Sequence, residues 1–228
     1  FAISNEETRY FLNGLYFNVT NEENKNTVTL VGTDGHRLAK FSHEIEEQVD
    51  QISGVIIPKK TIYELSKLLS EIDSDVEIFI SSNKIVFVIG DVIFISKLID
   101  GSFPDYKRVI PDDNKNILEI NRDKLLSAVD RVSTIANDKS PVIKFKILEN
   151  ILNLNTINNE SSTASEDLKI NYDGDEIEIG FNSKYIMDIV NNLNDNEISI
   201  KLKDNTSPVI AQENSNTNLV YVLMPMRV

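Results

Sequence analysis

The order of predicted helices and strands in the first half of this chain recurs in the second half. A capping residue followed by Glu6 and Glu7 predicts a helix near residues 4–13, and apolar residues at helical spacing predict helices near 58–70, 121–134 and 182–194. The third helix follows the first by about 120 residues, and the fourth follows the second by about the same distance, which indicates an internal repeat. Since domains usually span about 50–250 residues, the 228-residue chain is predicted to hold two copies of one domain. A single α+β domain with accidental regularity is the alternative.

Each predicted helix begins with a start signal, and the last three also have one apolar face. The expected starts are Ser4 or Asn5, Pro58, Asn121, and Asn182 or Ser183. In each of the last three helices, one set of apolar residues is expected to face the protein core. These are Ile62, Leu65, Leu68 and Leu69 in the second helix, Leu125, Leu126, Val129 and Val132 in the third, and Tyr185, Ile186, Ile189, Val190 and Leu193 in the fourth.

Alternating apolar residues predict strands in most of the remaining chain. Gly90-Asp91 separates two apolar runs and predicts a β-hairpin. Asp173-Gly174 is a second turn signal; its acidic residues hint at calcium, but the remaining ligand spacing is missing, so a solvated hairpin turn is preferred. The expected strands include Val76–Ile80, Ile85–Ile89, Val92–Leu98, Ile143–Ile147, Ile177–Ile179, Ile198–Leu202 and Val220–Met224.

The joint between the two domains is expected at Pro111–Asn116. This stretch begins with proline and is almost entirely polar, as linkers often are. The predicted domains are therefore residues 1–112 and 113–228. Because the chain begins with Phe1 rather than Met, we expect a fragment of a longer protein.

Composition excludes several classes of function. The chain has no cysteine, so it has neither disulfides nor thiolate chemistry, which fits the cytoplasm. No apolar run approaches the ~20 residues of a membrane span. A net charge of −13 argues against a protein that grips DNA with its whole surface. The sequence also lacks a Gly-rich phosphate loop, a G-x-S-x-G motif and a Cys/His ligand set, so no catalytic residue, metal or cofactor is predicted.

Five motifs, in order along the chain, are similar to signatures of one family. They are Arg9-Tyr10-Phe11-Leu12-Asn13-Gly14, Thr33-Asp34-Gly35-His36-Arg37-Leu38, Leu98–Tyr106, Ile179–Asn182 with Tyr185, and Met224-Pro225-Met226-Arg227. Together they resemble the bacterial sliding clamp, the beta subunit of DNA polymerase III. The resemblance covers the whole chain and implies the second and third of the family's three domains, with the first domain absent.

The resemblance implies an α+β fold: two tandem clamp domains, each with two helices packed on antiparallel sheets. It implies a processivity factor for DNA replication that is itself not catalytic. Such a factor is an accessory subunit of a DNA-directed DNA polymerase holoenzyme, and that holoenzyme is a nucleotidyltransferase, a kind of transferase. In full length, a cytoplasmic homodimer ring would encircle duplex DNA without reading its sequence. The implied protein partners are the replicative polymerase alpha subunit, the clamp loader and other proteins with clamp-binding motifs, with no membrane partner.

The resemblance also implies a peptide-binding groove between the two domains. Its apolar floor is assigned to Leu12, Leu38, Val109, Val222, Leu223, Met224 and Met226. Its walls and anchors are assigned to Thr33, Gly35, His36, Arg37, Pro104, Arg108, Asn182, Tyr185, Thr206, Pro208, Pro225 and Arg227. Pliable methionines suit a groove that accepts many peptides. Ser140 lies where well-known members of the family have an aromatic residue, which affects how deeply an aromatic side chain of the peptide is held.

In the family the helices line the hole of the ring. The implied DNA-facing residues are Arg9, Lys59, Lys60, Lys67, Arg122, Lys124, Arg131 and Lys184. The four predicted helices carry a net charge of +2 and the rest of the chain −15, the sign expected for a hole that tolerates a polyanion. Short segments also vary by a few charges without any function.

Two other functions remain open at this point. One is an acidic protein-interaction module unrelated to DNA, which would share the groove but form no ring. Taken without the family, Met224 and Met226 could also simply fill the core in an edge strand. The other is a hydrolase that uses His36 and Asp34, which is disfavoured because no nucleophile lies at a recognisable spacing.

Overall fold

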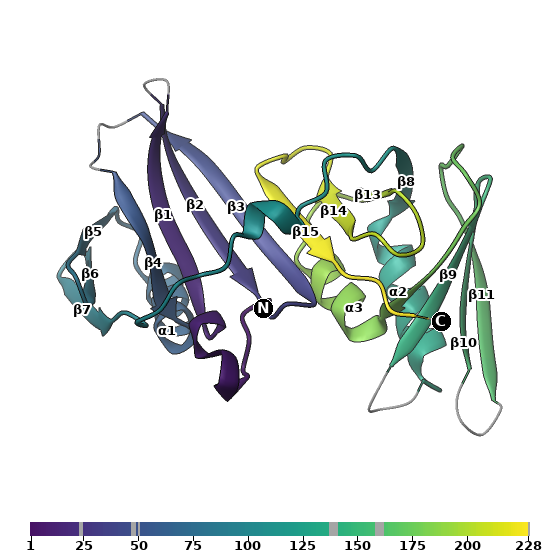
Figure 1. The fold of residues 1–228 in the computed structure, drawn as a ribbon, viewed down its shortest axis with the longest axis horizontal. Coiled ribbons are helices and arrows are strands. Elements are labelled where there is room, and N and C mark those ends of the chain that lie inside the picture. The colour runs from purple at the N-terminus through teal and green to yellow at the C-terminus, as the bar shows by residue number, and fades with distance from the viewer. Residues whose placement is uncertain (23–24, 47–48, 50, 137–140, 158–161, 228) are drawn as a thin grey trace. The chain divides into compact units, whose positions relative to one another are not determined.

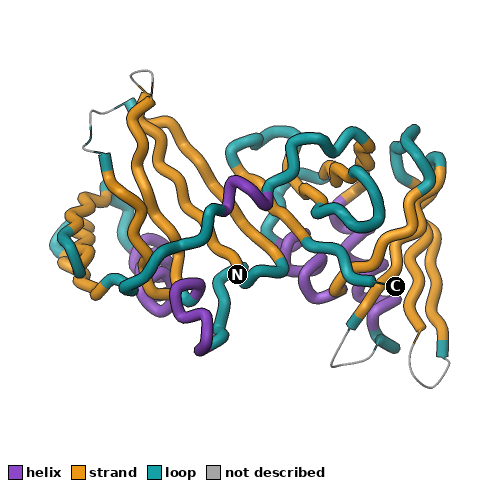
Figure 2. Tube along the Cα trace, viewed as in Figure 1, coloured by secondary structure: helices purple, strands orange, loops and turns teal. Residues whose placement is uncertain are grey.

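The computed structural model describes residues 1–22, 25–46, 49, 51–136, 141–157 and 162–227. The chain folds into two compact units, Phe1–Pro104 and Asp105–Val228. The division expected after residue 112 lies inside the second unit, between the 3-10 helix Tyr106–Val109 (η2) and β8, Asn116–Asn121. Figures 1 and 2 show helices and antiparallel strands in both units, as the α+β prediction requires.

The first unit contains two antiparallel sheets and a helix. A 3-10 helix, Glu7–Leu12 (η1), precedes the first sheet, which has the order β4-β1-β2-β3. Its strands are β1 (Gly14–Glu22), β2 (Lys25–Thr33), β3 (Arg37–Ile45) and β4 (Ile52–Pro58). Helix α1 (Lys59–Glu71) leads to the second sheet, β5-β6-β7, formed by Val76–Ile80, Lys84–Ile89 and Val92–Lys97.

The core of the first unit joins both sheets to α1. Phe17 and Ile57 from the first sheet lie in one buried cluster with Ile85, Phe87 and Ile89 from β6. The side chains of α1 that pack against this cluster are Ile62, Leu65 and Leu68. Leu69, expected on the same face, is 43% exposed, so its predicted burial is wrong.

The second unit has two four-stranded antiparallel sheets and two α-helices. One sheet has the order β11-β10-β9-β12, and the other has the order β15-β14-β13-β8. The strands after β8 are β9 (Val142–Leu148), β10 (Ile151–Ile157), β11 (Thr163–Lys169), β12 (Ile177–Asn182), β13 (Glu197–Leu202), β14 (Val209–Glu213) and β15 (Leu219–Leu223). The helices α2 (Arg122–Ser133) and α3 (Ser183–Asn191) contact each other, and their apolar faces are buried.

The element order within the second unit is itself repeated. A strand, a helix and three strands run from β8 to β11, and the same order runs from β12 to β15. Each sheet takes three strands from one half and the first strand of the other half. In the first unit β4, α1 and β5–β7 follow this order, and β4 pairs with β1 as β12 pairs with β9. The predicted repeat is therefore present at two levels.

The first unit differs from the second at one position of this repeat. In the second unit β8 pairs with β13 and α2 packs on β9, β10 and β11. Among the described residues of the first unit, no strand pairs with the outer edge of β5. A cavity of about 540 Å³ lies there, lined by apolar residues of β1, β2, β3, β4 and β5.

Two local predictions need correction. The first predicted helix is a six-residue 3-10 helix with non-helical dihedral angles at Arg9, because only Leu12 supplies a buried apolar side chain. The Asp173-Gly174 turn does not join a hairpin: β11 and β12, which flank it, lie at opposite edges of their sheet. Asn171 instead pairs with Glu119 beside β8 before the chain turns back. The Gly90-Asp91 hairpin between β6 and β7 is confirmed.

Candidate functional site

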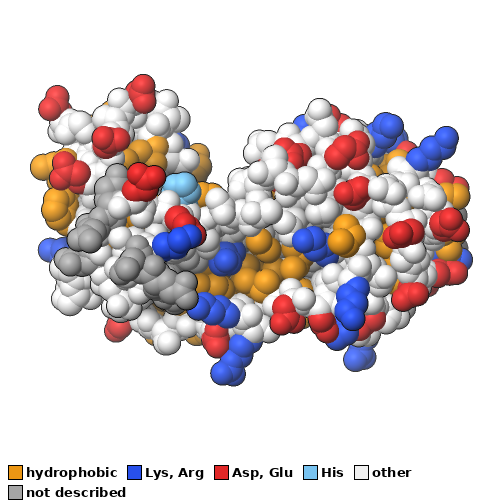
Figure 3. All heavy atoms as spheres, turned by 90° about the horizontal axis from the view of Figure 1, so that it is seen from above, with side chains coloured by type: hydrophobic (Ala, Val, Ile, Leu, Met, Phe, Trp, Pro, Cys, Tyr) orange, Lys and Arg blue, Asp and Glu red, His pale blue; other side chains and the backbone are white. Residues whose placement is uncertain are grey.

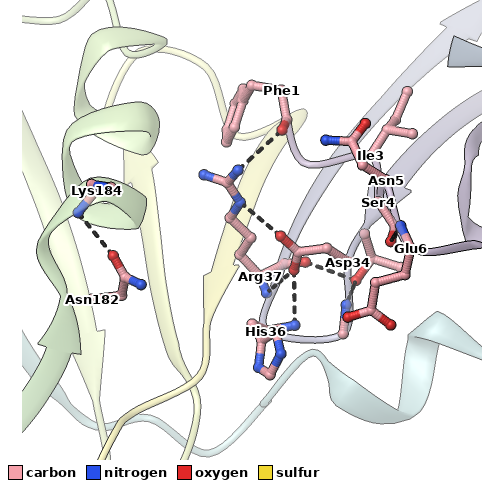
Figure 4. Close-up of polar contacts among 12 residues, drawn as sticks. Phe1, Ile3, Ser4, Asn5, Glu6, Asp34, His36, Arg37, Asn182 and Lys184 are labelled. Atoms are coloured by element: carbon pink, nitrogen blue, oxygen red, sulfur yellow. Dashed lines mark hydrogen bonds and ion pairs between the residues drawn. The ribbon is translucent and has the colours of Figure 1, made fainter. Parts of the chain in front are cut away.

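The turn between β2 and β3 is closed by its own side chains (Figure 4). The carboxylate of Asp34 accepts the N–H groups of His36 at 2.9 Å and Arg37 at 3.0 Å. The hydroxyl of Thr33 accepts the N–H of Gly35 at 3.1 Å and donates to the carbonyl of Arg37 at 2.7 Å. Gly35 has a φ of +88°, which favours glycine. The motif therefore forms a self-supporting turn that presents the side chain of His36 to solvent.

Two arginines are fastened to this turn. The guanidinium of Arg37 bonds to Asp34 at 3.1 Å and to the carbonyl of Phe1 at 3.2 Å, and it lies 5.3 Å from the centre of the Phe1 ring. Arg9 pairs with Glu6 at 2.7 Å and donates to the carbonyl of Asp34 at 3.1 Å. The bond from Arg9 lowers the pKa of Glu6. Both arginines thus stabilise the turn, whatever else they contact.

Of the other groove residues predicted in the first unit, some are buried and some are exposed. Leu12 and Leu38 are each 3% exposed, whereas His36 and Pro104 are exposed. A hydrolase would need Asp34 to orient the His36 imidazole, but both oxygens of the Asp34 carboxylate already accept hydrogen bonds within the turn. The geometry therefore gives no support to a catalytic His36–Asp34 pair.

The chain end in the second unit is held against β12. Val222 and Leu223 are buried in β15, and Met224 is 39% exposed. The N–H of Met226 donates to the carbonyl of Gly180 at 2.8 Å. Pro225 is half-buried, and the following Arg227 is exposed. The tail thus leaves one sheet and binds to the edge strand of the other.

The start of α3 lies close to this tail along β12. Asn182, two residues after Gly180, caps α3 by accepting the N–H of Lys184 at 3.0 Å (Figure 4). Tyr185 is half-buried in the first turn of the helix. Within the second unit, the structure therefore brings the tail and the α3 N-terminus to one end of β12.

A loop after β13 carries two more predicted residues. The carboxylate of Asp204 accepts the N–H groups of Thr206 and Ser207 at 2.8 and 2.7 Å and both of their hydroxyls at 2.9 Å. These bonds lower the pKa of Asp204 to about 2. The carbonyl of Pro208 accepts the side-chain amide of Asn114 at 3.0 Å. Asp204 and Asn114 were not predicted as site residues, although Asp204-Asn205-Thr206-Ser207 has the composition typical of a turn closed by side chains.

The last predicted groove residues lie in or near η2. Val109 is 45% exposed, and Arg108 pairs with Asp105 at 2.9 Å across a solvent-exposed surface. Such exposed pairs contribute about 0–1 kcal/mol, so Arg108 is available to a ligand at little cost. Ser140 lies outside the described residues.

Several of the predicted DNA-facing cations already have partners. Lys67 pairs with Glu64 at 3.7 Å, Arg122 with Asp123 at 2.8 Å and Arg131 with Glu166 at 2.6 Å. Lys59 bonds to the carbonyl of Ile3 and to the side chain of Asn5. In the part of the chain that the structure describes, Lys60, Lys124 and Lys184 are exposed and have no ion pair. Figure 3 shows basic and acidic side chains interspersed on the visible face.

Across the described residues, His, Asp and Glu side chains form no group of three or more placed to hold a metal ion. No helix among them has the length and apolarity to cross a membrane.

The family models for this polymerase subunit match both units. The model of the DNA polymerase III beta subunit, central domain, matches residues 1–105, and that of its C-terminal domain matches residues 107–227. Among curated proteins, the beta sliding clamp of Caulobacter vibrioides is 41% identical over 228 residues, and that of Escherichia coli K12 is 38% identical over 227 residues. Each match covers all of this chain but only 61% of the relative.

Solved structures agree with these matches. A DnaN sliding clamp from Bartonella birtlesii, bound to griselimycin, matches with a TM-score of 0.96 and 48% identity, over 100% of this chain and 61% of that one. The Caulobacter crescentus beta sliding clamp, with PEG bound to a putative beta-motif tethering region, matches with a TM-score of 0.95 and 40% identity. This match covers 100% of this chain and 60% of that one. None of these proteins supports the acidic module unrelated to DNA. The chain therefore belongs to the DNA polymerase III beta subunit family, and it spans that family's central and C-terminal domains.

Proposed function

We propose that this chain acts in DNA replication as part of a sliding clamp, a non-catalytic processivity factor that tethers a polymerase to duplex DNA. The observation that carries the proposal is the match of all of this chain to 61% of the Bartonella birtlesii DnaN clamp, with a TM-score of 0.96 at 48% identity. The chain spans about 61% of its curated relatives, and the rest of the clamp would complete a homodimer ring in the cytoplasm.

Duplex DNA would contact the ring through a few cations without sequence readout. A topological link needs few phosphate contacts, which agrees with a chain of net charge −13. Lys60, Lys124 and Lys184 are the strongest candidates, because the other proposed contacts share their charge with carboxylates or with backbone oxygens.

Partner proteins would bind through a short peptide. We propose that the turn at Thr33–Leu38, the tail at Met224–Arg227 and the first residues of α3 contribute to this site. Its support is a rigid turn in the first unit and, in the second, the bond between Met226 and Gly180 near the Asn182 cap. The partners proposed are the polymerase alpha subunit, the clamp loader and other proteins with clamp-binding motifs.

A peptide titration tests this site. A labelled peptide from the C-terminus of a replicative polymerase is expected to bind with micromolar affinity, about −8 kcal/mol. Deletion of Met224–Val228 is expected to remove most of the binding because it removes the pliable methionines. A matched control is Ile151→Ala, which truncates a side chain of the second unit that is 44% exposed. Unchanged affinity after the deletion would place the peptide elsewhere.

A further inference from the structure

The sheet β5-β6-β7 has a second apolar face. Along β6, Ile85, Phe87 and Ile89 are 0–2% exposed and face the core. Val86 and Val88 alternate with them and therefore lie on the opposite face. Both residues are half-buried valines at positions that are usually polar when one face of an antiparallel sheet meets water.

The neighbouring strands extend this face. Phe79 and Ile95 flank Val86 in register, and Ile93 pairs with Val88. Phe79 is 55% exposed, Ile95 58% and Ile93 65%. We call Phe79, Val86, Val88, Ile93 and Ile95 the outer apolar face. Contiguous exposed apolar residues in a soluble protein commonly mark an interaction surface.

The outer apolar face has a basic border at one end. The next pair in the same register is Lys84 with Lys97. Both lysines are exposed, and neither has an ion pair within the described portion of the chain. Glu77 lies at the other end, opposite Val88. The face thus combines an apolar centre with a paired positive charge, although the whole chain is acidic.

Size and charge select the occupant. The outer apolar face is small, because it consists of Phe79, Val86, Val88, Ile93 and Ile95, whereas a stable protein–protein interface takes roughly 20–30 residues from each partner. A second copy of this chain presents the same two lysines, so two such faces packed together would bring like charges close to each other, whereas a partner with carboxylates complements them. A single helix with an apolar stripe fits the area, because helices commonly cover sheet faces.

We propose that the outer apolar face binds an amphipathic helix of a partner protein, with large apolar side chains on one face and acidic residues beside them. The apolar stripe packs on Phe79, Ile93 and Ile95, and the carboxylates pair with Lys84 and Lys97. None of these residues belongs to the proposed peptide groove.

Two synthetic helical peptides serve as probes for the intact chain. Both are 16 residues long and carry Leu at positions i, i+3, i+4 and i+7; one has Glu beside the Leu stripe and the other has Lys at the same positions. By fluorescence anisotropy, the Glu peptide is expected to bind at least tenfold more tightly than the Lys peptide. Equal affinities, or no binding of the Glu peptide, would overturn the proposal.

Substitutions on the face locate the binding. Ile93→Thr with Ile95→Thr keeps β-branched residues in the strand and is expected to weaken the Glu peptide at least tenfold. Lys84→Glu with Lys97→Glu, which cannot disturb the core, is expected to reverse the preference between the peptides. Ile151→Thr on β10 is the control. Binding that none of the face variants changes would overturn the proposal.

Three further outcomes are decisive. Sedimentation that shows a dimer of the chain, lost in the double Thr variant, would assign the face to a second copy and contradict the proposal. Flotation with phosphatidylserine vesicles, lost in the same variant, would assign it to membrane and also contradict it. Deletion of Met224–Val228 is expected to leave binding of the Glu peptide unchanged, so failure here and failure of the proposed groove are distinguishable.

Discussion

Asp34 in the first unit and Asp204 in the second have the same structural role. Each carboxylate accepts two backbone N–H groups of the turn that follows it, at 2.7–3.0 Å. Charged acceptors make such bonds stronger than neutral ones. Both turns carry residues that are proposed to bind a peptide, so each aspartate fixes the backbone on which those residues lie.

The role of Asp204 predicts a pH dependence. Its pKa is about 2 in the folded chain, against an ordinary value of 3.8. A depressed pKa stabilises the fold at pH above the unfolded value, and this contribution is lost as pH falls toward 2. Asp204→Ala is therefore expected to lower the free energy of unfolding at pH 7 and to have a progressively smaller effect between pH 4 and pH 2. Urea unfolding at each pH measures this.

Asp204→Asn is the control for that experiment, because it retains an acceptor oxygen but cannot titrate. Its difference from Asp204→Ala is expected to stay constant with pH. An effect of Asp204→Ala at pH 2 as large as that at pH 7 would contradict the assigned cause.

The elements that were predicted well are those with local signals. For α2, a capping Asn and a sustained apolar stripe gave the start within one residue, and the Gly90-Asp91 turn identified the hairpin between β6 and β7. Strand order depends on contacts between distant segments. The Asp173-Gly174 turn signal therefore could not show that β11 and β12 lie at opposite edges of their sheet. The first predicted helix was wrong in type because its residues lack an apolar stripe.

The two Asn caps give a matched prediction at this scale. Asn121 and Asn182 each accept a backbone N–H of the first helical turn, at 3.1 and 3.0 Å. Asn121→Ala and Asn182→Ala are each expected to lower the free energy of unfolding by about 1 kcal/mol. Only Asn182→Ala is expected to weaken the polymerase peptide as well, because only this cap lies near the tail. Equal peptide affinities in the two variants would remove the α3 start from the proposed site.

For the whole molecule, the sequence located cations on the helices but did not reveal which are neutralised. Glu166, the partner of Arg131, lies on β11, and Leu193, whose carbonyl binds Arg122, lies beyond α3. Such pairs join segments that are far apart in the chain. The candidate site had the same limit: its motifs were visible, whereas the supports of Pro208 and Met226 come from distant residues.

Charge-reversal variants test whether the exposed lysines of the helices, rather than lysines elsewhere, face DNA. In the full-length protein, Lys60→Glu, Lys124→Glu and Lys184→Glu together are expected to shorten residence on DNA severalfold, because each adds an unpaired negative charge facing phosphates. The control triple variant is Lys25→Glu, Lys144→Glu and Lys203→Glu, which makes the same change of net charge on strands and loops. Single-molecule residence times measure both. Equal shortening in the two variants would contradict the assignment of the helices to the DNA side.

We propose that the complete protein holds DNA by topology rather than by affinity. The direct test is to load the full-length protein with its clamp loader onto nicked circular DNA, isolate the complex by gel filtration, and then cut the circle once. The protein is expected to stay on the circle in moderate salt and to be lost when the DNA becomes linear. Equal retention on circular and linear DNA, or no retention on the circle, would contradict it.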